Sequence, residues 1–237
     1  MPVSERFVGL YQEIITQHPI TIEFKDLATH PKVSFRQGTG FSNDQAGLLT
    51  VWLSTNQTAE RLEITAAHEC LHYVLGYEGY PITLRNPAAG DDEVLELVGG
   101  HLHCSLVDLE IDRRLRDRGF PILQKRLADL ERMMKELQTQ SPPPSDSPRG
   151  CLWVVRYVSV GMSSHYGVPR QARRRFLKEF ESRFSTMAPL AQQLLNKVSA
   201  VGIATSEQMV GGVRVLRDGL RLQGKLAVMN QRTRQVW

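Results

Sequence analysis

The sequence predicts an α+β fold, in which a minimal core (a small mixed sheet with one helix packed on it) is followed by a mainly helical C-terminal half. Short alternating or apolar runs before residue 54 are typical of strands, whereas later stretches repeat their apolar residues at helical spacing. A length of 237 residues suits one large domain or a domain with an appendage. Hydrophobic content of 41% and charged content of 23% are typical of a globular protein.

The first 53 residues are expected to supply one helix and the sheet. Apolar residues at helical spacing predict the helix over residues 5–17. Strands are predicted at residues 20–24, 33–36 and 48–53, of which the last is the strongest. Residues typical of turns precede this last strand: Gly38, Gly40, Asn43 and Asp44.

A helix that carries a metal-ligand motif follows the strongest strand. His68 and His72 stand four residues apart, so on a helix both imidazoles project from one face and can reach one metal ion. Glu69 follows the first histidine and leans towards a metal-bound water. A catalytic zinc site uses three protein ligands and leaves a fourth position for water, whose pKa the metal lowers to about 7. We therefore expect Zn²⁺ as the cofactor and Glu69 as the general base.

The segment His68-Glu69-Cys70-Leu71-His72 resembles the HExxH signature of the zincin zinc metallopeptidases. It is most similar to minimal, gluzincin-like members, in which the third ligand comes from a later helix, and the resemblance covers roughly residues 20–120. It implies hydrolysis of a peptide bond beside an edge strand that pairs with an extended substrate. Residues 48–53 could be this edge strand or an ordinary core strand. Cys70 points away from the metal side, and we expect it to be a buried small hydrophobe.

The third metal ligand is expected on a helix over residues 91–119. By helical phase, Glu110 falls on a charged side and is expected to pair with arginines in solvent. Asp108 falls on an apolar side, where a carboxylate is costly unless it is paired or binds a metal, so Asp108 is our third ligand. Asp112, one turn later, is placed to accept a hydrogen bond from a ligand histidine. The alternatives for the third ligand are Glu96, Glu110, His101 and His103.

The rest of the chain is predicted to be helical and basic. Residues 121–140 predict a helix that completes a metallopeptidase core over residues 1–140, and the Pro-rich segment 141–150 predicts a loop. Residues 1–150 hold 15 Lys and Arg against 21 Asp and Glu, a balance of −6, whereas residues 151–237 hold 14 against 4, a balance of +10. We expect the basic region 151–237 to pack on the core.

One helix of the basic region combines two patterns. It begins at Pro169 and repeats Phe176, Phe180 and Phe184 at helical spacing beside a cluster of arginines. The cluster could bind nucleic acid or an acidic partner, although we favour a solvated face or docking on the acidic half. Just before this helix, His165 and Tyr166 are candidate donors to an oxyanion.

Two classes of function follow from these patterns. The first is zinc-dependent hydrolysis of a peptide or protein substrate, with zinc at His68, His72 and Asp108. The alternative is a non-catalytic metal-binding scaffold or regulatory protein whose basic helices bind an acidic partner or nucleic acid.

Three further patterns concern location. The sequence contains no stretch of about 18 apolar residues, so it predicts no membrane span. The N-terminus has no signal-peptide layout. The three cysteines (Cys70, Cys104 and Cys151) have no C-x-x-C spacing and suggest no disulfide framework. We therefore expect a cytoplasmic protein.

Overall fold

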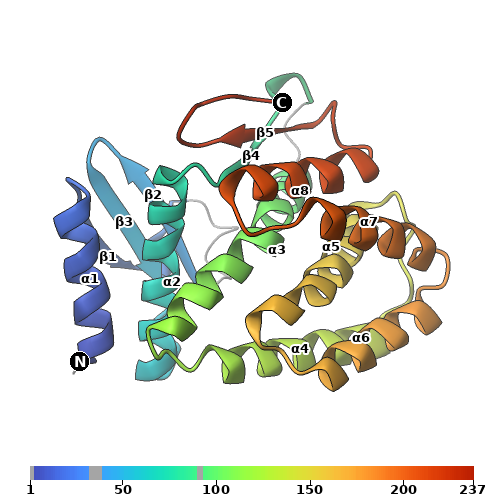
Figure 1. Ribbon diagram of the computed structural model, residues 1–237, viewed down its shortest axis with the longest axis horizontal. Helices are drawn as coiled ribbons and strands as arrows, with labels where there is room; N and C mark the ends of the chain where they lie inside the picture. Colours follow the sequence, from blue (N-terminus) through green and yellow to red (C-terminus); the bar gives the residue numbers. More distant parts are fainter. Residues whose placement is uncertain (1–2, 32–38, 90–92) are drawn as a thin grey trace. The chain divides into compact units, whose positions relative to one another are not determined.

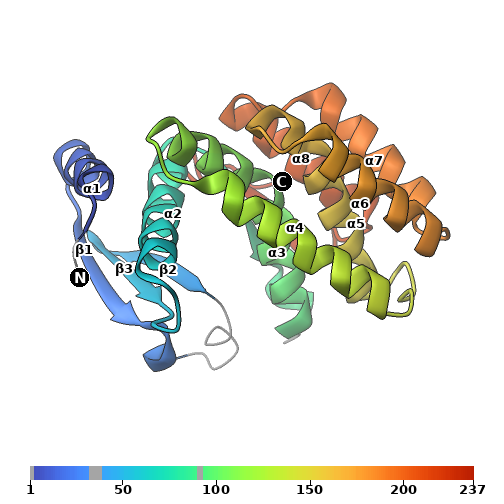
Figure 2. The same cartoon turned by 90° about the horizontal axis from the view of Figure 1, so that it is seen from below.

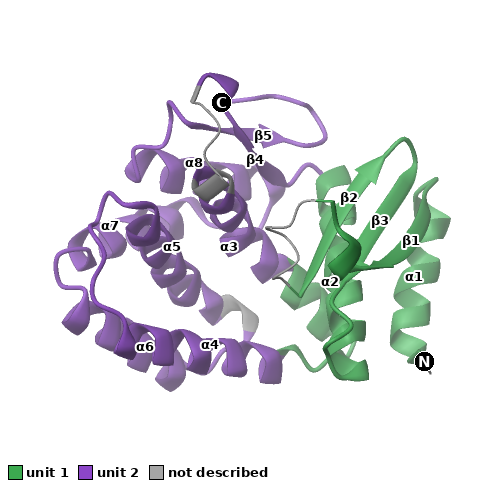
Figure 3. Cartoon of the chain, turned by 180° about the vertical axis from the view of Figure 1, so that it is seen from behind, with its two compact units in different colours: residues 1–77, 111–122 green, residues 78–110, 123–237 purple. Residues whose placement is uncertain are grey.

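The computed structural model describes residues 3–31, 39–89 and 93–237. Two compact units divide the chain (Figure 3): unit 1 consists of residues 1–77 and 111–122, and unit 2 consists of residues 78–110 and 123–237. Both contain helices and a small sheet, so the predicted α+β class is confirmed. The Pro-rich segment 141–150 lies inside unit 2, and the division between the units falls elsewhere.

Unit 1 is a three-stranded sheet with two helices on one face (Figure 2). The strand order is β1-β3-β2, in which β1 is parallel and β2 is antiparallel to β3. Alternate residues of the strands face the helices, and Leu49 and Val51 of β3 are fully buried there beside Ile22 of β1. The elements are α1 (Glu5–Gln17), β1 (Thr21–Asp26), β2 (Gly40–Gln45), β3 (Leu48–Leu53) and α2 (Ala59–Tyr77).

The hairpin of β2 and β3 differs from the sequence prediction. The strongest predicted strand, β3, pairs on both sides and is therefore a core strand, whereas β1 and β2 form the two edges of the sheet. Residues assigned to a turn, including Gly40 and Asn43, lie in β2 instead. The turn lies later, because Ala46 and Gly47 have positive φ angles of 51° and 82°, as a tight two-residue hairpin requires. The strand predicted at residues 33–36 lies outside the described residues.

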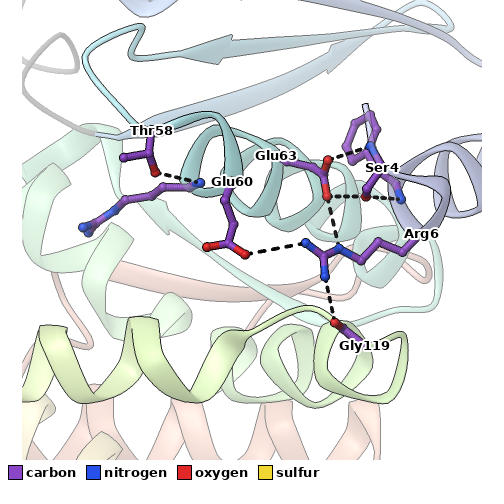
Figure 4. Close-up of polar contacts among 8 residues, drawn as sticks. Ser4, Arg6, Thr58, Glu60, Glu63 and Gly119 are labelled. Atoms are coloured by element: carbon purple, nitrogen blue, oxygen red, sulfur yellow. Dashed lines mark hydrogen bonds and ion pairs between the residues drawn. The ribbon is translucent and has the colours of Figure 1, made fainter. Parts of the chain in front are cut away.

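Polar contacts fix the start of α1 to α2 (Figure 4). The backbone N–H and the hydroxyl of Ser4 both donate to the Glu63 carboxylate, at 2.9 and 2.5 Å. Arg6 donates to the same carboxylate at 3.2 Å and to the carbonyl of Gly119 at 3.0 Å. These hydrogen bonds outweigh the effect of burial, which by itself raises the pKa of Glu63, so the net pKa of Glu63 is lowered.

Unit 2 is mainly helical, and its elements appear in Figure 1. Its two strands form an antiparallel pair. The part of α3 before residue 111 belongs to this unit and the rest of α3 belongs to unit 1. The elements are β4 (Pro81–Arg85), α3 (Glu93–Asp117), α4 (Ile122–Thr139), α5 (Pro148–Met162), α6 (Arg170–Arg183), α7 (Ala188–Val201), α8 (Ser206–Gly219) and β5 (Leu226–Asn230).

Aromatic side chains join α5 and α6. Phe176, Phe180 and Phe184 are fully buried, as their helical spacing predicts. The ring of Phe184 lies edge-on to Trp153 at 5.3 Å, and the ring of Phe180 lies 4.9 Å from Tyr157. One side of α6 is therefore held against α5. Among the helices that the structure describes, none combines the length and the apolar character that crossing a membrane requires.

Candidate metal centre

The motif helix α2 is well defined by its sequence. Thr58 precedes the helix, and its hydroxyl accepts a hydrogen bond from the backbone N–H of Arg61 at 3.3 Å, as a cap does. Gly76 does not end the helix, because α2 continues through it to Tyr77. The left-handed residue that follows is Gly79, with φ of 92°.

The two motif histidines lie one turn apart on α2. His68 is buried and His72 is half-buried. Their ring centroids are 4.9 Å apart, and the ring planes cross at 77°. This is the arrangement that the four-residue spacing predicts for two side chains on the same face of a helix.

Asp108 joins the two histidines in one cluster. His68, His72 and Asp108 each offer one ligand atom, and these three atoms all lie within 4.8 Å of one another. Two imidazoles and one carboxylate make a three-ligand set with a position left for water, which suits the hydrolytic use of zinc. The donor set therefore fits the metal that the sequence implies.

The structure describes three of the four other candidates for the third ligand, and none of these three belongs to the cluster. Among the described residues, His101 and His103 are outside the cluster, and so is Glu110. The prediction that Glu110 lies in solvent is wrong, because it is only 4% exposed. Leu109, Ile111 and Asp112 are buried as well, so α3 is covered on all sides at this turn. The side chain of Glu96 lies outside the described residues.

Asp112 is also buried, at 2% exposed. It follows Asp108 by one turn of α3 and belongs to the same unit as both histidines. The hydrogen bond from a ligand histidine to Asp112 stays a prediction.

Glu69 is held by an edge strand of the sheet. The Ser42 hydroxyl donates to Glu69 Oε2 at 2.9 Å. Gly40, on the same face of β2, lets the strand approach α2 closely, because a Cβ there would lie 2.6 Å from Thr65 Cγ2 and 3.1 Å from Glu69 Cγ. Sequence reasoning missed both roles. The available signal was the alternation of small residues, Gly40 and Ser42, around Phe41.

His103 and Cys70 are further residues that the sequence analysis singled out. His103 Nδ1 lies 3.2 Å from Thr83 Oγ1 and 3.3 Å from the Gly99 carbonyl. Burial lowers the pKa of His103, so its neutral form is favoured. Cys70 is buried as predicted, and burial raises the pKa of its thiol to about 12. The side chains of His165 and Tyr166 lie outside the described residues.

The arrangement can support proton transfer next to a metal. The three ligand atoms could hold one ion, and Glu69 adjoins the first histidine in sequence while its carboxylate is oriented by Ser42. Comparisons of this chain with protein-family models, with curated proteins and with solved structures find no match.

Proposed function

We propose that this chain is a zinc metallopeptidase that hydrolyses peptide bonds. The observation that carries the proposal is the cluster of His68, His72 and Asp108, whose ligand atoms lie within 4.8 Å of one another. The two histidines lie on α2, which also carries Glu69. A purely structural metal site has no use for a carboxylate at this place in the motif. The hydrogen bond from Ser42 to that carboxylate further supports a role in chemistry.

Each residue has a separate task in the proposed reaction. His68, His72 and Asp108 would hold the metal. When bound, zinc supplies a Lewis acid that polarises the peptide carbonyl and lowers the pKa of a water to about 7. Glu69 would take a proton from the water that adds to the carbonyl carbon, and would give that proton to the amide nitrogen as the C–N bond breaks. Ser42 holds one carboxylate oxygen of Glu69, which leaves the other to exchange the proton.

The edge strand β2 offers a place for an extended substrate. Within the described ranges, β2 pairs only with β3. A peptide that adds to its other edge would form main-chain hydrogen bonds with β2. Because Ser42 lies on this strand and contacts Glu69, the peptide backbone would pass close to the general base.

The test combines metal content with cleavage. We expect about one zinc per chain by elemental analysis, and cleavage of an unbiased peptide mixture by mass spectrometry. Glu69→Gln should keep zinc and lose roughly 10²–10⁴-fold in rate, because it keeps the shape of the side chain and removes the base. Glu60→Gln is the matched control, since Glu60 is an exposed carboxylate on the same helix.

Two outcomes contradict the proposal. A folded chain without metal removes the site altogether. A zinc-loaded chain that cleaves no peptide favours the alternative of a non-catalytic metal-binding protein.

A further inference from the structure

A second polar surface lies on α6, far along the chain from the motif. Five residues line a hollow of about 510 Å³: Arg170, Gln171, Arg174, Arg175 and Lys178. We name these five residues the basic face of α6. The surface is independent of the proposed peptidase function, because the candidate metal cluster contains no residue of α6.

The cations of the basic face are unpaired among the described residues. All four of its cations are exposed, and within the described part of the chain none of them makes an ion pair or a side-chain hydrogen bond. The two acidic residues of α6 have other partners. Glu179 pairs with Arg183 at 3.8 Å, and Glu181 accepts a hydrogen bond from Tyr157 at 2.5 Å.

The cations also crowd one another. Arg173 lies between Arg170 and Arg174 in sequence, and its guanidinium donates to the carbonyls of Val168 and Gly161 at 3.2 and 3.3 Å. Burial lowers the pKa of Arg173, and the charges of Arg170 and Arg174 lower it further. A polyanion bound to this face would relieve the repulsion.

The opposite side of α6 fixes the orientation of the basic face. Phe176 and Phe180 are fully buried on that side, and the ring of Phe180 lies against Tyr157 of α5. The helix therefore presents Arg170, Arg174 and Lys178 in one row, with about 6 Å of axial rise between successive cations. A regular row of cations suits a regular row of anions.

The residue types of the face select among polyanions. Guanidinium groups bind phosphate through two parallel hydrogen bonds, which favours phosphate over isolated carboxylates. The phenylalanines of α6 are buried, and the basic face contains no aromatic ring on which an unpaired base could stack. We propose that the basic face of α6 binds the phosphate backbone of double-stranded nucleic acid without reading its bases.

Salt dependence tests this proposal with the full chain. The probe is a fluorescent mixed-sequence DNA duplex of about 20 base pairs, and anisotropy reports binding. Four phosphate contacts predict that affinity falls roughly 150-fold between about 50 and 200 mM salt, since each contact contributes about 0.9 to the slope. The triple variant Arg170→Gln, Arg174→Gln, Lys178→Gln keeps one cation, so its affinity should fall only about 3- to 4-fold over the same range.

A second triple variant is the matched control. Lys197→Gln, Arg232→Gln and Arg234→Gln remove the same charge from exposed positions of unit 2 outside the basic face. This control should keep the steep salt dependence of the parent. Circular dichroism and thermal unfolding check that both variants are folded.

Four outcomes would overturn the proposal. If both triple variants lose the same affinity for the duplex, binding depends on net charge alone and not on the basic face. Tighter binding of the unpaired strand than of the duplex would contradict backbone recognition of a double helix. Displacement of the duplex by polyglutamate at an equal concentration of charge would point to an acidic protein. No binding at about 50 mM salt would remove the surface as a nucleic-acid site.

Discussion

Glu69 and the basic face of α6 both carry charge, but only the charge of Glu69 is held by a hydrogen-bond partner. Ser42 holds the Glu69 carboxylate at 2.9 Å, and Gly40 makes room for its side chain. The four cations of the basic face have no such partners within the described residues, and they share only the direction that their helix provides. Chemistry needs a charge at a defined position, whereas attraction of a polyanion needs only sign and density.

The largest effect is expected at the ligands. His68→Ala should abolish zinc binding, because it removes the buried ligand and leaves only His72 and Asp108, which are both half-buried. Asp108→Ala should only weaken zinc binding, because both imidazoles of α2 remain. Elemental analysis after dialysis against a weak chelator measures both. Glu96→Gln is the comparison variant, and if it loses zinc while Asp108→Ala keeps it, Glu96 is the third ligand.

A smaller effect is expected when the partner of the base is removed. Ser42→Ala should leave zinc content unchanged and lower the rate of peptide cleavage about 10- to 150-fold, because a hydrogen bond to a charged group contributes about 1.5–3 kcal/mol. Ser42→Thr keeps the hydroxyl and suits a strand, so it should restore most of the rate. Equal rates for Ser42→Ala and the parent would show that Glu69 does not depend on this contact.

The contacts at Glu63 predict a pH-dependent stability. Because the pKa of Glu63 is lowered below its ordinary value of 4.5, its stabilising effect is present above that value and is lost as pH falls through the folded-state pKa. Glu63→Gln should lower the free energy of unfolding by about 1–2 kcal/mol at pH 7. Urea unfolding at several pH values should show this difference shrinking in acid.

The smallest effect is expected on α6. Replacing Arg170, Arg174 and Lys178 by glutamine should change the free energy of unfolding by less than about 0.5 kcal/mol, since like charges one turn apart repel only weakly. Urea unfolding of the triple variant measures this change. A clear loss of stability would show that these cations have a structural role, and the contrast with Glu69 would then fail.

Much of the fold could be predicted from local patterns. The apolar periodicity of residues 5–17 predicted α1, and the phenylalanine spacing predicted the buried side of α6. The hairpin could not be predicted in the same way. Strand β2 is rich in polar residues, and its pairing with β3 depends on a turn at Ala46 and Gly47 rather than on its own propensity.

In the candidate site too, features set by local geometry could be predicted, and features set by packing between distant elements could not. The spacing of His68 and His72 follows from helix geometry, so it could be predicted without tertiary information. Asp108 required an argument from helical phase on another element. The burial of Glu110 and the contact of Ser42 with Glu69 could not be predicted, because both depend on packing between elements distant in sequence.

The two-residue turn at Ala46 and Gly47 has a consequence for how this protein tolerates change. The turn sets which residue of β2 stands opposite which residue of β3, and Ser42 stands opposite Val51. Side chains alternate between the faces of a strand, so an insertion of one residue that shifts the pairing by one position would turn the Ser42 side chain away from α2. An insertion that shifts it by two would present Asp44 or Gly40 to Glu69 instead of Ser42. The length of this turn therefore decides whether the Ser42 hydroxyl reaches Glu69. An insertion or deletion in the turn should lower the rate of peptide cleavage as much as Ser42→Ala does.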